Sequence, residues 1–225
     1  MRQLLYIPLV HEPADLGSAG EPLVRESARL VGERRWSIHQ EAMARFWEQV
    51  TAVLNALEPH QIRVYQDGLP AGGKVGMRIV EEAARRGSRN HALIRDLIGR
   101  GAELRKTEAP ELLLQEHQRL LGISYSPPNA VAPKGAPIES SRTQADRLLR
   151  ERNEFIADTI NATLREGEIG VLFIGAYHDV ASRLAPDIVV QYIRDPAKVK
   201  AYFQALFSER NERTFAELAR DLQGA

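Results

Sequence analysis

The sequence predicts an α/β protein with a mixed, mainly parallel central sheet flanked by helices. Short apolar runs alternate along the 225-residue chain with longer segments of helical periodicity, and this order builds parallel sheets. The clearest run, residues 170–175, is apolar between two glycines, as in strands that are buried on both faces. We expect a single α/β domain over residues 1–225, with its site at the carboxyl ends of the strands.

The composition narrows the class of protein. Thirty basic and thirty acidic residues give a formal charge of zero, whereas nucleic-acid-binding proteins usually carry a basic excess. No apolar run approaches the roughly 20 residues that span a bilayer, and the start lacks the cleavage region of a signal peptide. The absence of cysteine excludes thiol catalysis and fits a reducing compartment. We therefore expect a cytoplasmic protein with neither a nucleic-acid nor a membrane partner.

The first half of the chain carries three predicted strands, and polar residues follow each of them directly. The strands cover residues 3–10, 62–66 and 102–106, and they run into His11-Glu12, Asp67 and Thr107-Glu108. Between them, apolar residues at helical spacing predict helices. These helices cover residues 35–57, 75–86, 90–99 and 111–121.

Residues 122–140 hold four prolines and show no clear periodicity. An irregular segment of this length is usually a lid, a binding loop or a disordered linker, and we take it as a candidate lid or binding loop. The remaining predicted elements are a helix at 141–165, strands at 170–175 and 188–193, and helices at 196–207 and 209–222. Aromatic residues of the last two helices, such as Tyr202 and Phe215, either cap the sheet or form a homodimer surface.

The polar residues after the strands suggest a site. The fourth such pair, His178-Asp179, follows the 170–175 strand, so two histidines and several carboxylates come to one predicted edge. Imidazole and carboxylate groups are ligands of zinc, manganese and cobalt, and they also serve as general acids and bases. The alternative for each acidic residue is a helix N-cap or a turn.

Arg152 adds a cation to this set. It lies on the apolar stripe of the 141–165 helix, four residues after Leu148 and three before Phe155, so it faces the core. A buried guanidinium without a partner costs several kcal/mol, and we expect a carboxylate such as Asp67 to pair with it. The other candidate partner is a substrate carbonyl or anion at the sheet edge.

The C-terminal half resembles a known pattern, in which a helix with Glu-Arg precedes a buried strand ending in Gly-x-x-His. Here Glu151-Arg152 precedes the strand that ends in Gly175-Ala176-Tyr177-His178. The pattern looks like the TraB-type version found in a superfamily of TraB-like proteins, Tiki proteases, ChaN-like haem-binding lipoproteins and erythromycin esterases. The superfamily also has a histidine motif in its first strand and an acidic residue after its second. His11 and Asp67 stand in matching places, although the first motif lacks its glycine and glutamate is usual where Asp67 stands.

The resemblance implies a metal-assisted, hydrolase-like site. Together with the strand-end histidines, it predicts an enzyme that acts on an amide or ester of a small-molecule or peptide substrate, with a divalent manganese, cobalt or zinc ion. A metal-bound water would attack, Glu12 or Glu108 would accept its proton, and Arg152 would stabilise the oxyanion. The predicted metal ligands are His11, Asp67 and His178, with Glu12 as an alternative to Asp67. The competing hypothesis is a non-catalytic small-ligand-binding or sensor module that uses the same sheet edge.

Overall fold

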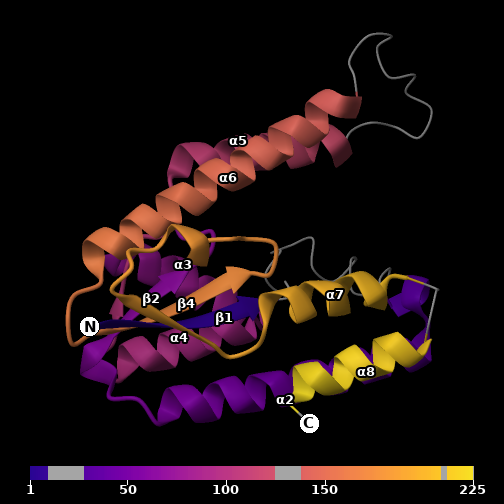
Figure 1. Ribbon diagram of the computed structural model, residues 1–225, viewed down its shortest axis with the longest axis horizontal. Coiled ribbons are helices and arrows are strands. Elements are labelled where there is room, and N and C mark those ends of the chain that lie inside the picture. Colours follow the sequence, from indigo (N-terminus) through magenta and orange to yellow (C-terminus); the bar gives the residue numbers. More distant parts are fainter. Residues whose placement is uncertain (10–27, 125–137, 209–211, 225) are drawn as a thin grey trace.

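The computed structural model describes residues 1–9, 28–124, 138–208 and 212–224. Within them, one five-stranded sheet has the order β3-β2-β4-β1-β5 (Figure 1). Every strand pair in this sheet is parallel, which confirms the predicted α/β class. The strands are β1 (Arg2–Leu9), β2 (Ile62–Gln66), β3 (Glu103–Leu104), β4 (Ile169–Gly175) and β5 (Ile188–Tyr192).

Helices connect the strands and cover both faces of the sheet. They are α2 (Glu33–Asn55), α3 (Gly73–Arg85), α4 (Arg89–Gly99), α5 (Pro110–Ser124), α6 (Ile138–Thr163), α7 (Pro196–Leu206) and α8 (Glu212–Gln223). None of the helices in the described ranges combines the length and apolar character that crossing a bilayer requires.

Alternate residues of the strands enter two separate cores, because successive side chains of a strand point to opposite faces. From β1, Leu5 and Ile7 pack with residues of α2, α4, α7 and α8. Leu4 and Tyr6 pack on the other face with α6, through residues such as Ile156. Figure 1 accordingly shows α6 on one side of the sheet and α2 with α8 on the other.

The terminal helices belong to the first of these cores. Tyr202 and Phe215 are fully buried, and the Tyr202 hydroxyl lies 2.8 Å from Nδ1 of His39 on α2. Burial lowers the pKa of His39 to about 4, so this histidine stays neutral within the core. These aromatic residues therefore cap the sheet, which was one of the two roles expected for them. The other role, a homodimer surface, stays a prediction.

Several element boundaries differ from those expected, most clearly around residues 122–140 and in β3. Helix α5 continues to Ser124 and α6 begins at Ile138, so the irregular stretch predicted at 122–140 is too long at both ends. The part of the candidate lid or binding loop at 125–137 lies outside the described residues. Strand β3 keeps only two of the five residues predicted at 102–106. Just beyond it, the N–H groups of Thr107 and Glu108 donate to the carbonyl of Leu69, and Thr107 Oγ1 accepts the N–H of Gln66. These contacts take the place of the strand ladder.

The sheet order places the ends of β2, β4 and β1 side by side. Beyond the last ladder pairs, the N–H of Asp67 donates to Phe173 O and the N–H of Ala176 donates to Leu9 O. The residues that follow β2 and β4 are therefore fixed against neighbouring strands, and they meet at one edge of the sheet.

Candidate functional site

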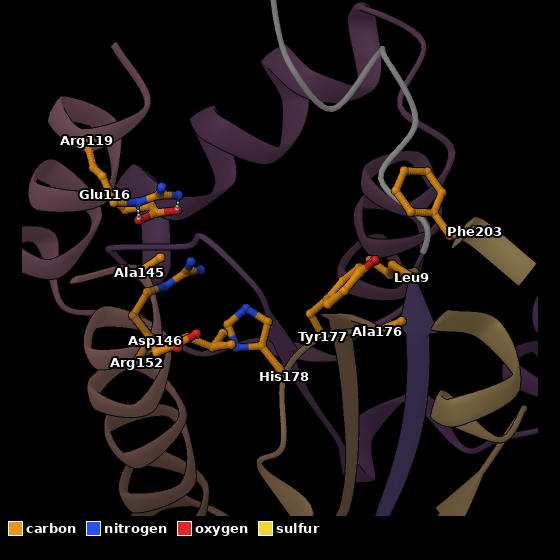
Figure 2. A pocket seen from close by; sticks show the side chains of 12 residues that line it. Leu9, Glu116, Arg119, Ala145, Asp146, Arg152, Ala176, Tyr177, His178 and Phe203 are labelled. Carbon is orange, nitrogen blue, oxygen red and sulfur yellow. Dashed lines mark hydrogen bonds and ion pairs between the residues drawn. The ribbon is translucent and has the colours of Figure 1, made fainter. Parts of the chain in front are cut away.

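A cavity of about 360 Å³ lies at this edge, between the ends of β1 and β4 and helices α5, α6 and α7. Its size is within the usual range for small-molecule sites. Figure 2 shows polar side chains of α5 and α6 on one side, and Leu9 and Phe203 on the other. The lining residues are Leu9, Glu116, Arg119, Ala145, Asp146, Leu149, Arg152, Gly175, Ala176, Tyr177, His178 and Phe203.

Arg152 reaches this cavity from α6 while buried carboxylates hold it from behind. Its Nη2 lies 2.6 Å from both Asp67 Oδ1 and Glu108 Oε1, and its Nε donates to the same Glu108 oxygen at 3.0 Å. Nη1 makes no hydrogen bond to any described residue, and the side chain lines the cavity. Arg152 lies on the inward side of α6, as the apolar stripe predicted, with 13% of its side chain exposed, and Asp67 is one of its two partners.

Glu108 is the second partner of Arg152 and the most buried acid of the cluster, with no exposed surface. Burial raises the pKa of its carboxyl to about 7; Arg152 opposes this shift, and the nearby Asp67 charge adds to it. Its Oε2 is buried without a hydrogen-bond partner among the described residues, and a lone carboxylate oxygen in the interior disfavours the ionised form. Glu108 therefore changes charge near neutral pH.

His178 lines the cavity next to this cluster. Its Nδ1 lies 2.6 Å from Oδ1 of Asn153, which is buried on α6, and its Nε2 lies 3.5 Å from Asp67 Oδ2. Because the amide oxygen of Asn153 is an acceptor, the proton of the neutral ring sits on Nδ1. The basic nitrogen is then Nε2, beside a carboxylate. The Tyr6 hydroxyl also donates to the backbone carbonyl of His178, at 3.2 Å.

Asp67 links these parts to the sheet. Its Oδ1 accepts a hydrogen bond from Nη2 of Arg152, and its Oδ2 accepts one from the N–H of Gly175 at 3.1 Å. The side-chain amide of Gln66 donates to the backbone carbonyl of Asp67, and Asn90 of α4 holds that amide in turn. The position of Asp67 therefore depends on β4 and α4 as well as on its own strand.

No family model, curated protein or solved structure matches this chain. The resemblance to the TraB-type pattern stays a prediction.

The structure brings together all four predicted site residues that it describes, although strand order cannot be deduced from one sequence. Arg152 and His178 line the cavity, whereas Asp67 and Glu108 lie behind them. The other two predicted residues, His11 and Glu12, lie outside the described residues.

The described residues do not by themselves fit a divalent metal. The guanidinium of Arg152 occupies the position between the Asp67 and Glu108 carboxylates, where a cation would otherwise balance them. Across the described ranges, no group of three histidine, aspartate or glutamate side chains is arranged to hold a metal ion. A manganese, cobalt or zinc site that also uses His11 stays a prediction.

Several residues of the site were not assigned from the sequence, among them Asn153, Glu116, Arg119 and Asp146. Asn153 follows Arg152 directly on α6, and an asparagine at a position buried to 95% needs a polar partner. That burial could have been expected from the helical stripe, but the partner could not. Glu116 and Arg119 of α5 form a two-bond ion pair at 2.7 Å on the cavity wall, and their i,i+3 spacing is also typical of solvated helix faces.

Proposed function

We propose that the protein is a hydrolase-like enzyme that cleaves an amide or ester bond of a small molecule held in this cavity. One observation carries the proposal: a basic imidazole nitrogen and an uncommitted guanidinium nitrogen line the same cavity, and buried polar groups hold both from behind. A base and an oxyanion-stabilising cation are the minimum that water-mediated acyl transfer needs.

His178 takes the role of general base. Its Nδ1 proton is held by Asn153, so Nε2 is the nitrogen that can take a proton from an attacking water. The imidazolium formed in this step would be stabilised by Asp67, whose Oδ2 lies 3.5 Å from Nε2. The arrangement favours proton uptake at the moment of attack, and the same proton can then pass to the leaving group.

Arg152 takes the role of oxyanion stabiliser. Two of its three nitrogens are bound by Asp67 and Glu108, which prevents the side chain from rotating away from the cavity. Nη1 then donates to the substrate carbonyl oxygen, and its bond strengthens as negative charge develops there. Donors that are fixed before the reaction need no reorganisation during it.

Glu108 acts through Arg152 in this proposal and does not touch the substrate, because it is fully buried and does not line the cavity. It is a positioning residue. The proton-accepting role predicted for Glu108 or Glu12 passes to His178, and no step uses a metal ion.

The proposal is tested with a panel of 4-nitrophenyl esters and 4-nitroanilides of varied acyl groups. His178→Ala should lower kcat/KM by at least about 100-fold on any substrate that the wild-type protein turns over. His117→Ala is the matched control, because His117 is exposed on α5 and does not line the cavity. Equal rates for wild type and His178→Ala would disprove the proposal. Loss of activity when a chelator is added would instead support the predicted metal-dependent mechanism.

A second candidate is the non-catalytic binding or sensor module. It is favoured by the cavity walls, where Leu9 and Phe203 lie opposite the polar side chains, since apolar walls with a few polar groups hold small ligands without any reaction. Stoichiometric ligand uptake measured by calorimetry, with no turnover of the panel above, would support this module over the enzyme.

A further inference from the structure

The charged groups that line the cavity differ in whether they are already neutralised. Arg119 makes two hydrogen bonds to Glu116, both of 2.7 Å, and Arg152 is held by Asp67 and Glu108. Each guanidinium therefore meets at least one carboxylate at ion-pair distance. An anionic ligand at Nη1 of Arg152 would therefore also meet the negative charge of these carboxylates, two of which have at most 4% of their surface exposed.

Asp146 is the exception. It lines the cavity from α6, and no described residue makes an ion pair or hydrogen bond with its carboxylate. Figure 2 shows Asp146 and Arg152 projecting from α6 toward the side of the cavity where His178 lies. A cationic ligand would find an available carboxylate there without breaking an existing pair.

The rest of the lining suits the body of an organic amine. Tyr177 and Phe203 present aromatic side chains, and Leu9 presents an aliphatic one; aromatic rings attract cations over their faces. Two other cations are close: Nε of Arg150, which does not line the cavity, donates to the backbone carbonyl of Asp146 at 3.3 Å, and the ammonium of Lys200 lies 4.9 Å from the centre of the Tyr177 ring. Lys200 is not among the lining residues, so it does not neutralise Asp146 inside the cavity.

We infer that the ligand of this cavity is a small organic cation, a molecule with a protonated amine beside an aromatic or aliphatic body, and that Asp146 is the residue that selects it. The inference rests on the proposed function only in taking the ligand as a substrate whose amide or ester bond is cleaved. The preference of Asp146 for a cation concerns binding alone. Asp146 is a specificity-determining residue, distinct from the proposed base and oxyanion stabiliser.

Three probes of nearly equal size separate charge from shape: 2-phenylethylamine, 2-phenylethanol and phenylacetate. Their binding to the full chain is measured by titration calorimetry at about pH 8, where the amine is still protonated. The amine should bind about tenfold more tightly than the alcohol, and phenylacetate more weakly than either, as expected for a partly solvated charge pair.

Asp146→Asn should remove the preference for the amine and leave the affinity for 2-phenylethanol unchanged. Asp158→Asn is the matched control, because Asp158 is exposed on the same helix and does not line the cavity. Tightest binding of phenylacetate, an unchanged amine preference in Asp146→Asn, or no binding of any probe at millimolar concentration would each overturn the inference. Selective amine binding without turnover of any amine-bearing amide or ester would contradict the proposed enzyme and leave the inference standing.

Discussion

The sheet carries an arginine between two carboxylates at each of its ends, and the two clusters differ in the burial of their acids. At the amino end, Arg63 pairs with Glu168 and Glu103, at 2.6 and 3.4 Å. At the carboxyl end, Arg152 pairs with Asp67 and Glu108. The two arginine side chains are exposed to a similar extent, 16% and 13%. The side chains of Glu103 and Glu168 are 51% and 12% exposed, whereas those of Asp67 and Glu108 are 4% and 0% exposed.

The comparison shows that burial of the acid, more than burial of the arginine, separates a structural ion pair from a candidate site. A half-exposed carboxylate keeps its hydration and gains little from a partner. A fully buried one depends on its partner for its charge state, and that dependence holds Arg152 in one place beside the cavity.

The largest effect should come from removing the central arginine of each cluster. Arg152→Met leaves two buried carboxylates without a counter-charge and should lower the free energy of unfolding by about 3–5 kcal/mol. Arg63→Met should lower it by less, about 1–2 kcal/mol, because Glu103 keeps its contact with water and Glu168 keeps the hydrogen bond from the N–H of Arg165. Urea denaturation of both variants measures the difference, and equal losses would show that the two clusters are energetically alike.

The next effect depends on pH and isolates Glu108. Burial raises its pKa to about 7 in the folded protein, above the ordinary glutamate value of 4.5, so the folded state binds this proton more tightly than the unfolded state. The stabilisation is fully present below pH 4.5 and is lost as pH rises through about 7, by roughly 3 kcal/mol in all.

Glu108→Gln removes this titration. The difference in unfolding free energy between wild type and Glu108→Gln should therefore shift in favour of the variant as pH rises across that window, in denaturation curves recorded at several pH values. Glu103→Gln, which replaces a half-exposed carboxylate of the other cluster, serves as the matched control. A wild-type-minus-variant difference that stays constant with pH would mean that Glu108 does not titrate there.

A smaller effect is expected from the residue that orients His178. Asn153→Ala leaves the Nδ1 proton of His178 without its acceptor, which should cost about 1–3 kcal/mol of stability and about tenfold or more in turnover. Asn153→Asp keeps an oxygen at this position and should restore most of the rate, with a changed pH–rate profile. If Asn153→Ala and Asn153→Asp lost the same activity, orientation of the ring would not be the role of Asn153.

The smallest effect belongs to the amino end. Glu103→Gln should change the free energy of unfolding by less than about 1 kcal/mol, and added salt should reduce even this difference, because exposed pairs are screened. Turnover should be unaffected. A loss comparable to that of Arg152→Met would remove the contrast between the two clusters.

The sequence predicted much of the carboxyl-end cluster because each part leaves a local signal. An apolar run followed by a polar residue identifies the positions of Asp67 and His178, and the helical stripe identifies Arg152 as buried. Glu108 was placed at a strand end but not against Arg152, since that pairing depends on β3 lying beside β2. Strand order is a long-range property that no local pattern encodes, and for the same reason Asn153 could not be matched to His178.

The position of β1 in the sheet has a consequence for synthesis on the ribosome. This strand precedes the other described strands in the sequence, yet its neighbours are β4 and β5, and its Gln3 pairs with Ile169 and Val189. The apolar segment Leu4–Leu9 therefore stays unpaired with its native neighbours until more than 160 further residues have been synthesised. Contacts between residues this distant in sequence slow folding, and they prolong the time for which aggregation-prone apolar segments are exposed. The nascent chain should for this reason depend on chaperones until residue 192 has left the exit tunnel.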